Sequence, residues 1–336
     1  MKEQDTRLMS VKNIITDLRI ANYHITGVIG EGERGPVLQL ENGDGNIYTG
    51  KFIRRGSDMP QFIRESLGLQ REMKLSEHLY HPKIQTAKEV YVTQGGTFVV
   101  VKEYVPGRSL REIIDDEGQV SPENLVPILS SAVDVLAYLQ DKSQHPEVGI
   151  VCHRDIKPEH IIVNDEWDVT LIDFDKSYSV NETIPYVARH RGIRRLYDPP
   201  ESILYLNSPF TNEDIYALGV CAVEALFGEI PKSLSDNSEC SSEYFFDDNR
   251  KKAYLLPKDI PEGLRSIIEN MVHPDPKKRF LPKISYNETL ESICKNDAPI
   301  ELESVDLDSF QIGKGVISFF EQKIRTWNNY VHNFFK

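Results

Sequence analysis

The chain has 336 residues, of which 40% are hydrophobic and 27% are charged, an ordinary composition for a globular protein. Its net charge of −13 argues against sequence-independent nucleic-acid binding, because such binding requires clustered Lys and Arg side chains. The four cysteines form no C-x-x-C pair, and no segment is typical of a signal peptide or of a bilayer-spanning helix. These features predict a soluble, cytoplasmic protein.

The N-terminal part of the chain is predicted to be mainly strand. Residues 1–20 form a short extension, and the β-rich runs that follow are 25–29, 37–40, 47–53, 89–93 and 97–104. Asn42-Gly43-Asp44-Gly45 is typical of a hairpin turn between two of these strands. One helix, residues 61–79, interrupts the strands.

Pro106-Gly107 ends this β-rich part, and the remainder is predicted to be mainly helical, with helices at 122–141, 211–228 and 262–272. The order of elements predicts an α+β fold with two lobes. Its expected parts are an N-terminal extension, a β-rich lobe, a helical lobe and a tail, at residues 1–20, 21–105, 106–296 and 297–336.

A glycine motif lies early in the strand region. Gly30-Glu31-Gly32-Glu33-Arg34-Gly35 has the form G-x-G-x-x-G, but a strand follows it where a dinucleotide-binding fold requires a helix. A β-hairpin is therefore expected. Glycines in its turn let backbone N–H groups approach phosphates, and a plain glycine turn is the alternative.

Two charged residues that follow this motif are candidates for binding nucleotide phosphates or for supporting that binding. Lys51 lies on the strand after the hairpin, where a lysine can hold nucleotide phosphates as a point charge. Glu72, on the predicted helix, can orient it through an ion pair. A solvated surface charge is the alternative for each residue taken alone.

A more specific pattern begins at His153-Arg154-Asp155 and includes Lys157. Asp155 can accept a proton from a substrate hydroxyl, and Lys157 can neutralise charge on a transferring phosphoryl group. Asp173 ends a β-rich run, and a carboxylate there suits a hard divalent cation such as Mg²⁺. The alternative, two turn aspartates, is weakened because the motifs occur in order.

Taken together, these motifs resemble the eukaryotic-type (Hanks-type) protein kinase family over residues 21 to about 295. The resemblance implies a bilobal kinase fold, ATP and Mg²⁺ as cofactors, and a hinge at residues 103–107 whose backbone binds adenine. The catalytic residues that it implies are Asp155, Lys157, Lys51 and Glu72. The nucleotide-binding residues that it implies are Gly30, Glu31, Gly32, Gly35, Val37, Lys51, Glu103, Val105 and Ser109.

The resemblance extends into the second half of the chain. Pro199-Pro200-Glu201 is similar to the end of the activation segment, and Arg279 to the arginine that pairs with Glu201. Asp214 is similar to the aspartate that braces the catalytic loop from a buried helix. The activation segment is expected to run from Asp173 to Glu201.

Two departures concern the metal site, where Asp173 and His160 are the expected ligands. His160 stands where the family has Asn, and imidazole offers nitrogen where Mg²⁺ prefers oxygen. A softer ion such as Mn²⁺, an empty second metal position, and a structural hydrogen bond are the alternatives for His160. Asp175 replaces a glycine, which limits flipping of Phe174.

Other departures affect the nucleotide and substrate sites. Thr49 replaces the usual Ala against the adenine, and Lys102 is a charged residue at the back of the pocket that needs a partner or water. Arg194 stands where Ser/Thr-specific kinases place a Thr. Arg154 is expected to receive a phosphate from the activation segment, whose candidate acceptors are Ser177, Ser179, Thr183 and Tyr186.

The tail is predicted to contain an amphipathic helix. Its apolar residues recur at spacings of three and four: Ile317, Phe320, Ile324, Trp327, Val331 and Phe334. Packing on the helical lobe is the first interpretation, and contact with a partner or a second copy is the next. Few lysines lie on its polar face, which disfavours a membrane.

The favoured function is transfer of the γ-phosphoryl group of ATP to Ser or Thr of a protein substrate. A pseudokinase that acts as an ATP-binding or scaffold module is the alternative, motivated by the departures above. A small-molecule or lipid kinase of the same fold is a third interpretation, disfavoured by Glu201, Asp214 and Arg279.

Overall fold

The computed structural model describes residues 22–32, 35–53, 59–92, 98–181, 196–199, 212–230, 260–273, 276 and 279. All of them belong to the first of the chain's two units, Met1–Glu301. Several predicted features therefore lie outside the described residues. They are the extension at 1–20, the tail at 297–336, Thr183, Tyr186, Arg194 and Glu201.

The N-terminal part forms a five-stranded antiparallel sheet with the order β1-β2-β3-β5-β4. Its strands are β1 (Tyr23–Gly32), β2 (Gly35–Asn42), β3 (Ile47–Ile53), β4 (Ala87–Val92) and β5 (Phe98–Glu103). The glycine motif closes the β1–β2 hairpin, with Gly32 opposite Gly35. The predicted hairpin is thus confirmed.

The turn between β2 and β3 follows from its polar residues. The side-chain Oδ1 of Asn42 accepts hydrogen bonds from the backbone N of Asp44 and of Asn46, at 3.0 and 2.9 Å. Such side-chain bonds stabilise a tight reversal of the chain. Gly45 has a φ of 82°, a conformation that glycine adopts without strain.

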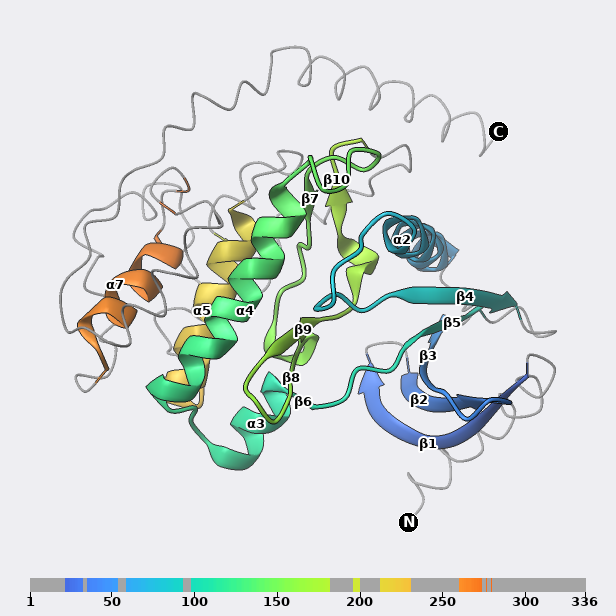
Figure 1. Ribbon diagram of the computed structural model, residues 1–336, viewed down its shortest axis with the longest axis horizontal. Coiled ribbons are helices and arrows are strands. Elements are labelled where there is room, and N and C mark those ends of the chain that lie inside the picture. Colours follow the sequence, from blue (N-terminus) through green and yellow to red (C-terminus); the bar gives the residue numbers. More distant parts are fainter. Residues whose placement is uncertain are drawn as a thin grey trace. The chain divides into compact units, whose positions relative to one another are not determined.

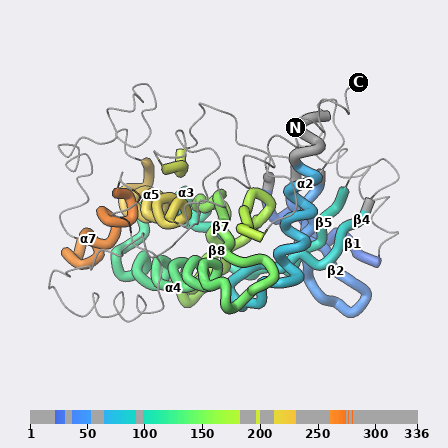
Figure 2. Tube along the Cα trace, turned by 90° about the horizontal axis from the view of Figure 1, so that it is seen from above, coloured from blue at the N-terminus to red at the C-terminus, as the bar shows by residue number. Residues whose placement is uncertain are grey.

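Buried apolar residues lie on both faces of the sheet. Alternate residues such as Leu38, Leu40, Phe52 and Val101 form a buried cluster on one face, as strand geometry requires. On the other face Val100 belongs to a cluster with Leu69 of helix α2 (Met59–Ser76). Both views of the structure place α2 next to β4 (Figures 1 and 2).

The second part is mainly helical. Its helices are α3 (Leu110–Glu117), α4 (Pro122–Gln140), α5 (Glu213–Phe227) and α7 (Glu262–Met271). Helix α5 contacts both α4 and α7, and its residues from Glu213 to Leu226 are buried (Figure 1). The predicted helices at 122–141, 211–228 and 262–272 are confirmed, whereas α3 was not predicted.

Short strands and one-turn helices connect these longer helices. Strands β6 (Arg108–Ser109), β8 (Ile161–Val163) and β9 (Val169–Leu171) form one sheet, and β7 (Val151–Cys152) pairs with β10 (Tyr178–Ser179). The one-turn helices η2 (Pro158–His160) and η3 (Phe174–Lys176) follow β7 and β9. This α+β arrangement confirms the predicted fold class. No helix in the described part of the chain has the length and apolarity needed to cross a bilayer.

Candidate active site

The loop between β7 and η2 is held by the first turn of α5. The two carboxylate oxygens of Asp214 accept hydrogen bonds from the backbone N of His153 and of Arg154, each at 2.7 Å. Arg154 has a φ of 64°, a conformation that is uncommon for a residue other than glycine. The bracing role predicted for Asp214 is confirmed.

His153 joins this loop to the turn that follows β9. Its Nε2 lies 3.0 Å from the carbonyl oxygen of Ile172, so Nε2 carries the proton and donates it. Its Nδ1 accepts from the backbone N of Asp155, and its ring packs against Phe174 at a centroid distance of 4.5 Å. The contacts of His153 bring Asp155 and Asp173 into one site.

Asp155 is a buried carboxylate with cations on several sides. The Lys176 Nζ donates to its Oδ2 at 2.9 Å, and the Lys157 Nζ lies 4.0 Å from the same atom. Burial raises the pKa of Asp155, but the opposing influence of His160, Lys176 and Lys157 outweighs it and lowers the pKa to about 2. Asp155 is therefore ionised at neutral pH.

His160 lies between the two aspartates. Its Nδ1 lies 2.8 Å from the backbone carbonyl oxygen of Asp155, which only accepts, so Nδ1 is the donor. The other nitrogen, Nε2, lies 3.4 Å from Oδ2 of Asp173. Burial lowers the pKa of His160, so its neutral form presents a lone pair to a carboxylate oxygen. A cation between these two atoms would bind both.

Asp173 itself adopts an unusual backbone conformation. It lies in the left-handed region, with a φ of 70° and a ψ of 69°, a strain that concentrates at functional sites. Burial opposes its ionisation, but Lys51 and Lys102 are close enough to hold its pKa well below the usual range. Among the described residues no three His, Cys, Asp or Glu side chains converge as a metal cluster, so a cation held by Asp173 and His160 needs further ligands from substrate or water.

The charged pairs differ from the predicted arrangement. Lys51 Nζ contacts the carboxylate of Asp173 at 2.5 and 2.6 Å and Asp175 Oδ2 at 3.4 Å. The carboxylate of Glu72 instead pairs with Lys102, whose Nζ also lies 3.4 Å from Asp173. The expected ion pair between Lys51 and Glu72, both described residues, is therefore wrong. Lys102, a second lysine on the sheet, forms the ion pair with Glu72 of α2 in place of Lys51.

The turn at Asp175 is tied to helix α2. The backbone oxygen of Asp175 accepts a hydrogen bond from Arg71 Nη1 at 3.1 Å. A Cβ atom on Gly68 would lie 2.8 Å from the same oxygen, so only glycine permits this close approach. These contacts support the interpretation that the turn containing Phe174 is restricted, although flipping itself stays a prediction.

The expected nucleotide-binding residues lie on the sheet and on the segment that leaves it. Gly30 pairs with Val37 across the hairpin, and Glu31, Gly32 and Gly35 follow at its end. Glu103 ends β5, and its backbone oxygen already accepts from Gln85 Nε2 at 2.9 Å. Val105 is half-buried after β5.

Ser109 has a structural role of its own. Its hydroxyl caps helix α3, accepting from the backbone N of Glu112, while the Glu112 side chain accepts from the backbone N of Ser109 at 2.7 Å. This capping box stabilises the start of α3. Nucleotide binding by Ser109 stays a prediction.

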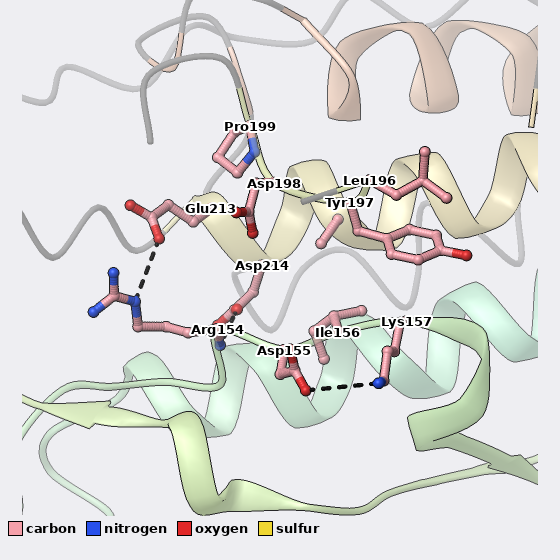
Figure 3. A pocket seen from close by; sticks show the side chains of 11 residues that line it. Arg154, Asp155, Ile156, Lys157, Leu196, Tyr197, Asp198, Pro199, Glu213 and Asp214 are labelled. Atoms are coloured by element: carbon pink, nitrogen blue, oxygen red, sulfur yellow. Dashed lines mark hydrogen bonds and ion pairs between the residues drawn. The ribbon is translucent and has the colours of Figure 1, made fainter. Parts of the chain in front are cut away.

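A pocket of about 350 Å³ opens beside Asp155. Its walls come from the catalytic loop, the start of α5 and the described segment 196–199, including Lys157, Tyr197 and Asp198 (Figure 3). In Figure 3 the Arg154 side chain extends toward Glu213, 3.6 Å away, whereas the Asp155 carboxylate points toward Lys157. The pocket therefore presents an ionised carboxylate and a lysine to whatever enters it.

One network was missed by the sequence analysis. Arg111 donates to Oε1 of Glu224 at 2.8 Å and to the Tyr197 hydroxyl at 3.0 Å, and Tyr197 donates to Oε2 of Glu224 at 2.7 Å. It joins α3, α5 and the pocket wall. Nothing local in the sequence marks these residues, because they come from three distant segments.

Two expected phosphate acceptors are buried. The Ser177 hydroxyl donates to the carbonyl oxygen of His153 at 3.2 Å, and the Ser179 hydroxyl donates to that of Val148. The expectation that these serines accept phosphate is therefore wrong for the folded protein, because their hydroxyls are committed inside it. Arg279, whose predicted partner Glu201 is not described, donates to the carbonyl oxygen of His273 at 2.6 Å.

Comparison with known proteins identifies the family of the chain. The family model described as protein kinase domain matches residues 23–290. Mouse Aurora kinase C is 26% identical over 263 residues, 78% of this chain and 88% of the relative. Serine/threonine-protein kinase cds1 of Schizosaccharomyces pombe is 26% identical over 294 residues, 84% of this chain and 60% of the relative.

Another relative is serine/threonine-protein kinase 12 of Arabidopsis thaliana, 28% identical over 212 residues, 62% of this chain and 44% of the relative. The chain spans about half the length of several curated relatives that it matches. The family model nevertheless covers most of the chain, including the sheet, the catalytic loop and α5. The chain belongs to the protein kinase family.

Proposed function

We propose that this chain is an ATP-dependent Ser/Thr protein kinase with an atypical metal site. The observation that carries the proposal is the ionised Asp155, which lines a pocket together with Lys157 and lies in one site with Asp173 and Lys51. These are the charges that phosphoryl transfer requires: a carboxylate for the hydroxyl, and cations for the phosphates. The Ser/Thr relatives support this substrate class.

In the proposed reaction the substrate hydroxyl oxygen attacks the γ-phosphorus of ATP, the bond from that phosphorus to the β–γ bridging oxygen breaks, and ADP leaves. Asp155 accepts the hydrogen bond of the hydroxyl and aims its oxygen. Because its pKa is about 2, Asp155 is a weak base and acts chiefly by orientation, and the hydroxyl proton is released to solvent as the new P–O bond forms. Lys157 offsets charge on the transferring group, and Lys51 holds the inner phosphates.

The metal site is proposed to use Asp173 and His160. A divalent ion bound there would neutralise phosphate charge during transfer. The unprotonated Nε2 of His160 beside a carboxylate oxygen fits a cation that accepts nitrogen ligands, which favours Mn²⁺ over Mg²⁺. Lys51, which contacts the same carboxylate, must give way or share it.

A pseudokinase is the second candidate, and one observation favours it. Asp155 is paired with Lys176 and Asp173 with Lys51, so the key carboxylates are neutralised by lysines of the same chain. A site of this kind could hold its shape without catalysing transfer.

Transfer of labelled phosphate from ATP to a generic Ser/Thr protein substrate, in Mg²⁺ and in Mn²⁺, separates the two candidates. Asp155→Asn is the matched variant, because it removes the charge and preserves the shape. We expect transfer by the parent protein, fastest in Mn²⁺, and at least a hundredfold loss in the variant, about 3 kcal/mol in transition-state stabilisation. No transfer in either ion, with ATP still raising the melting temperature, would establish the pseudokinase.

A further inference from the structure

Lys102 is a buried cation in the middle of the candidate active site. It lies on β5, is 2% exposed, and pairs with Glu72 of α2, whose side chain is 4% exposed. An ammonium group removed from water requires a close opposite charge, because its desolvation is otherwise strongly unfavourable. The pair is therefore an internal connection between the sheet and the helix.

The sheet register explains how two lysines reach the same site. Thr49 lies opposite Lys102, and Lys51 lies opposite Val100, in the antiparallel ladder of β3 and β5. Opposed residues share a face of the sheet, and so do residues two apart on one strand. Lys51 and Lys102 consequently point to the same face, the one that α2 covers.

The two lysines have different principal partners, although Lys102 Nζ also lies 3.4 Å from Asp173. Glu72 forms an ion pair with Lys102. The Oε1 atom of Glu72 also accepts a hydrogen bond from the backbone N of Phe174 at 3.2 Å. Lys51 has Asp173 and Asp175. Glu72 thus connects α2, β5 and the turn that positions Asp173, and it does so without Lys51.

We propose that Lys102 is a positioning residue that anchors helix α2 through Glu72, and that Lys51 is thereby reserved for Asp173 and the phosphates of the nucleotide. The consequence for turnover rests on the proposed kinase function. The consequence for the position of α2 does not, since it concerns contacts within the chain.

The matched variants are Lys102→Met and Lys51→Met, with Lys83→Met as the control. Lys83 also forms an ion pair, 2.8 Å from Asp168, but both side chains are partly exposed and lie outside the site. Hydrogen exchange of the α2 amides, measured without nucleotide, reports the anchor directly. Lys102→Met should accelerate exchange in residues 65–76 by about tenfold or more, and Lys51→Met by much less. Equal acceleration, or a larger effect of Lys51→Met, would overturn the proposal.

Lys102→Met leaves Glu72 buried without its cation, and this variant risks unfolding. The double variant Lys102→Met/Glu72→Gln removes both charges and keeps an acceptor for Phe174. If the two residues form one unit, the double variant should melt above Lys102→Met by about 5 °C or more. Additive losses from the two substitutions would contradict the pairing.

Kinetics separate positioning from a general loss of stability. Measured below the melting range, Lys102→Met should lower kcat by at least tenfold and leave the KM for ATP nearly unchanged. Lys51→Met should raise that KM. Lys102→Arg, which keeps the charge, should recover part of the kcat that Lys102→Met loses. If Lys102→Met changes only the KM for ATP and leaves kcat unchanged, the positioning role is wrong. If the parent protein transfers no phosphate, the proposed function fails, and the exchange and melting results still decide the anchor.

Discussion

Lys176 donates a hydrogen bond to Oδ2 of Asp155 across 2.9 Å, so a lysine two residues beyond Phe174 engages the carboxylate that lines the pocket. Lys157 approaches the same oxygen from the catalytic loop. The carboxylate therefore carries two lysine neighbours, and its acidity depends on both.

Replacing Lys176 by Met should change the pH dependence of the reaction. The proposed reaction uses the ionised form of Asp155, so we expect activity to be lost as the pH falls through its pKa, which Lys176 helps to lower to about 2. Without Lys176 the pKa rises, so the acidic limb of kcat/KM should move to higher pH by about 1 unit or more. The exposed Lys142→Met serves as the control. If the acidic limbs of the kcat/KM profiles coincide in the variant and the parent, groups other than Lys176 lower the pKa of Asp155.

The same pKa predicts a contribution to stability. An aspartate whose pKa falls from 3.8 to about 2 on folding stabilises the native state above pH 4 by about 2 kcal/mol, and this stabilisation is lost between about pH 4 and pH 2. Urea unfolding of the parent and of Asp155→Asn should therefore converge as the pH falls through this range. A difference in unfolding free energy between the parent and Asp155→Asn that does not change with pH would contradict this contribution.

Asp214→Ala should destabilise the protein by about 2–5 kcal/mol, because it leaves one buried and one partly buried N–H group without an acceptor. The left-handed backbone of Arg154 would also lose its support. Urea unfolding measures the effect, with the exposed Glu166→Ala as the control. A loss below 1 kcal/mol would mean that the loop finds another acceptor.

His160→Asn should shift the metal preference toward Mg²⁺, because an amide oxygen is the harder ligand. The ratio of kcat/KM in Mn²⁺ to that in Mg²⁺ is the measurement, and His24→Asn, on the exposed surface of β1, is the control. We expect the ratio to fall several-fold. An unchanged ratio would limit His160 to its hydrogen bond with the Asp155 carbonyl oxygen.

Tyr197→Phe removes the hydroxyl that joins Arg111 to Glu224 at the pocket wall. Hydrogen bonds to charged groups contribute about 1.5–3 kcal/mol, so kcat/KM for the protein substrate should fall about tenfold or more. The KM for ATP should stay constant if the pocket lined by Asp155 and Tyr197 receives the protein substrate. Tyr80→Phe, at a 77% exposed site, is the control. A raised KM for ATP would place the network on the nucleotide side.

The sequence predicted the five strands of the N-terminal sheet, the four helices α2, α4, α5 and α7, and the bracing of the catalytic loop by Asp214. Alternating apolar residues and the ordered motifs carry that information locally. Helix α3 was missed because it has eight residues and depends on the mutual capping of Ser109 and Glu112. A helix this short has too few turns for its periodicity to stand out.

The ion pairs of the site could not be predicted in the same way. Glu72 had two lysines within reach, Lys51 and Lys102, and the choice depends on sheet register and on side-chain reach. The contact of Lys176 with Asp155 depends likewise on the shape of the turn after Asp173. Motifs identify which residues meet, but the fold decides which charges pair.

The buried ammonium of Lys102 also bears on inhibitor design. A compound that extends an apolar group toward the back of the predicted nucleotide site would meet this charge, and desolvating it is unfavourable. A compound that carries a carboxylate to the same place would compete with Glu72 for it. Such an acidic ligand should bind the parent protein more tightly than Lys102→Met, and ligands built for an uncharged residue at this position should show the reverse order.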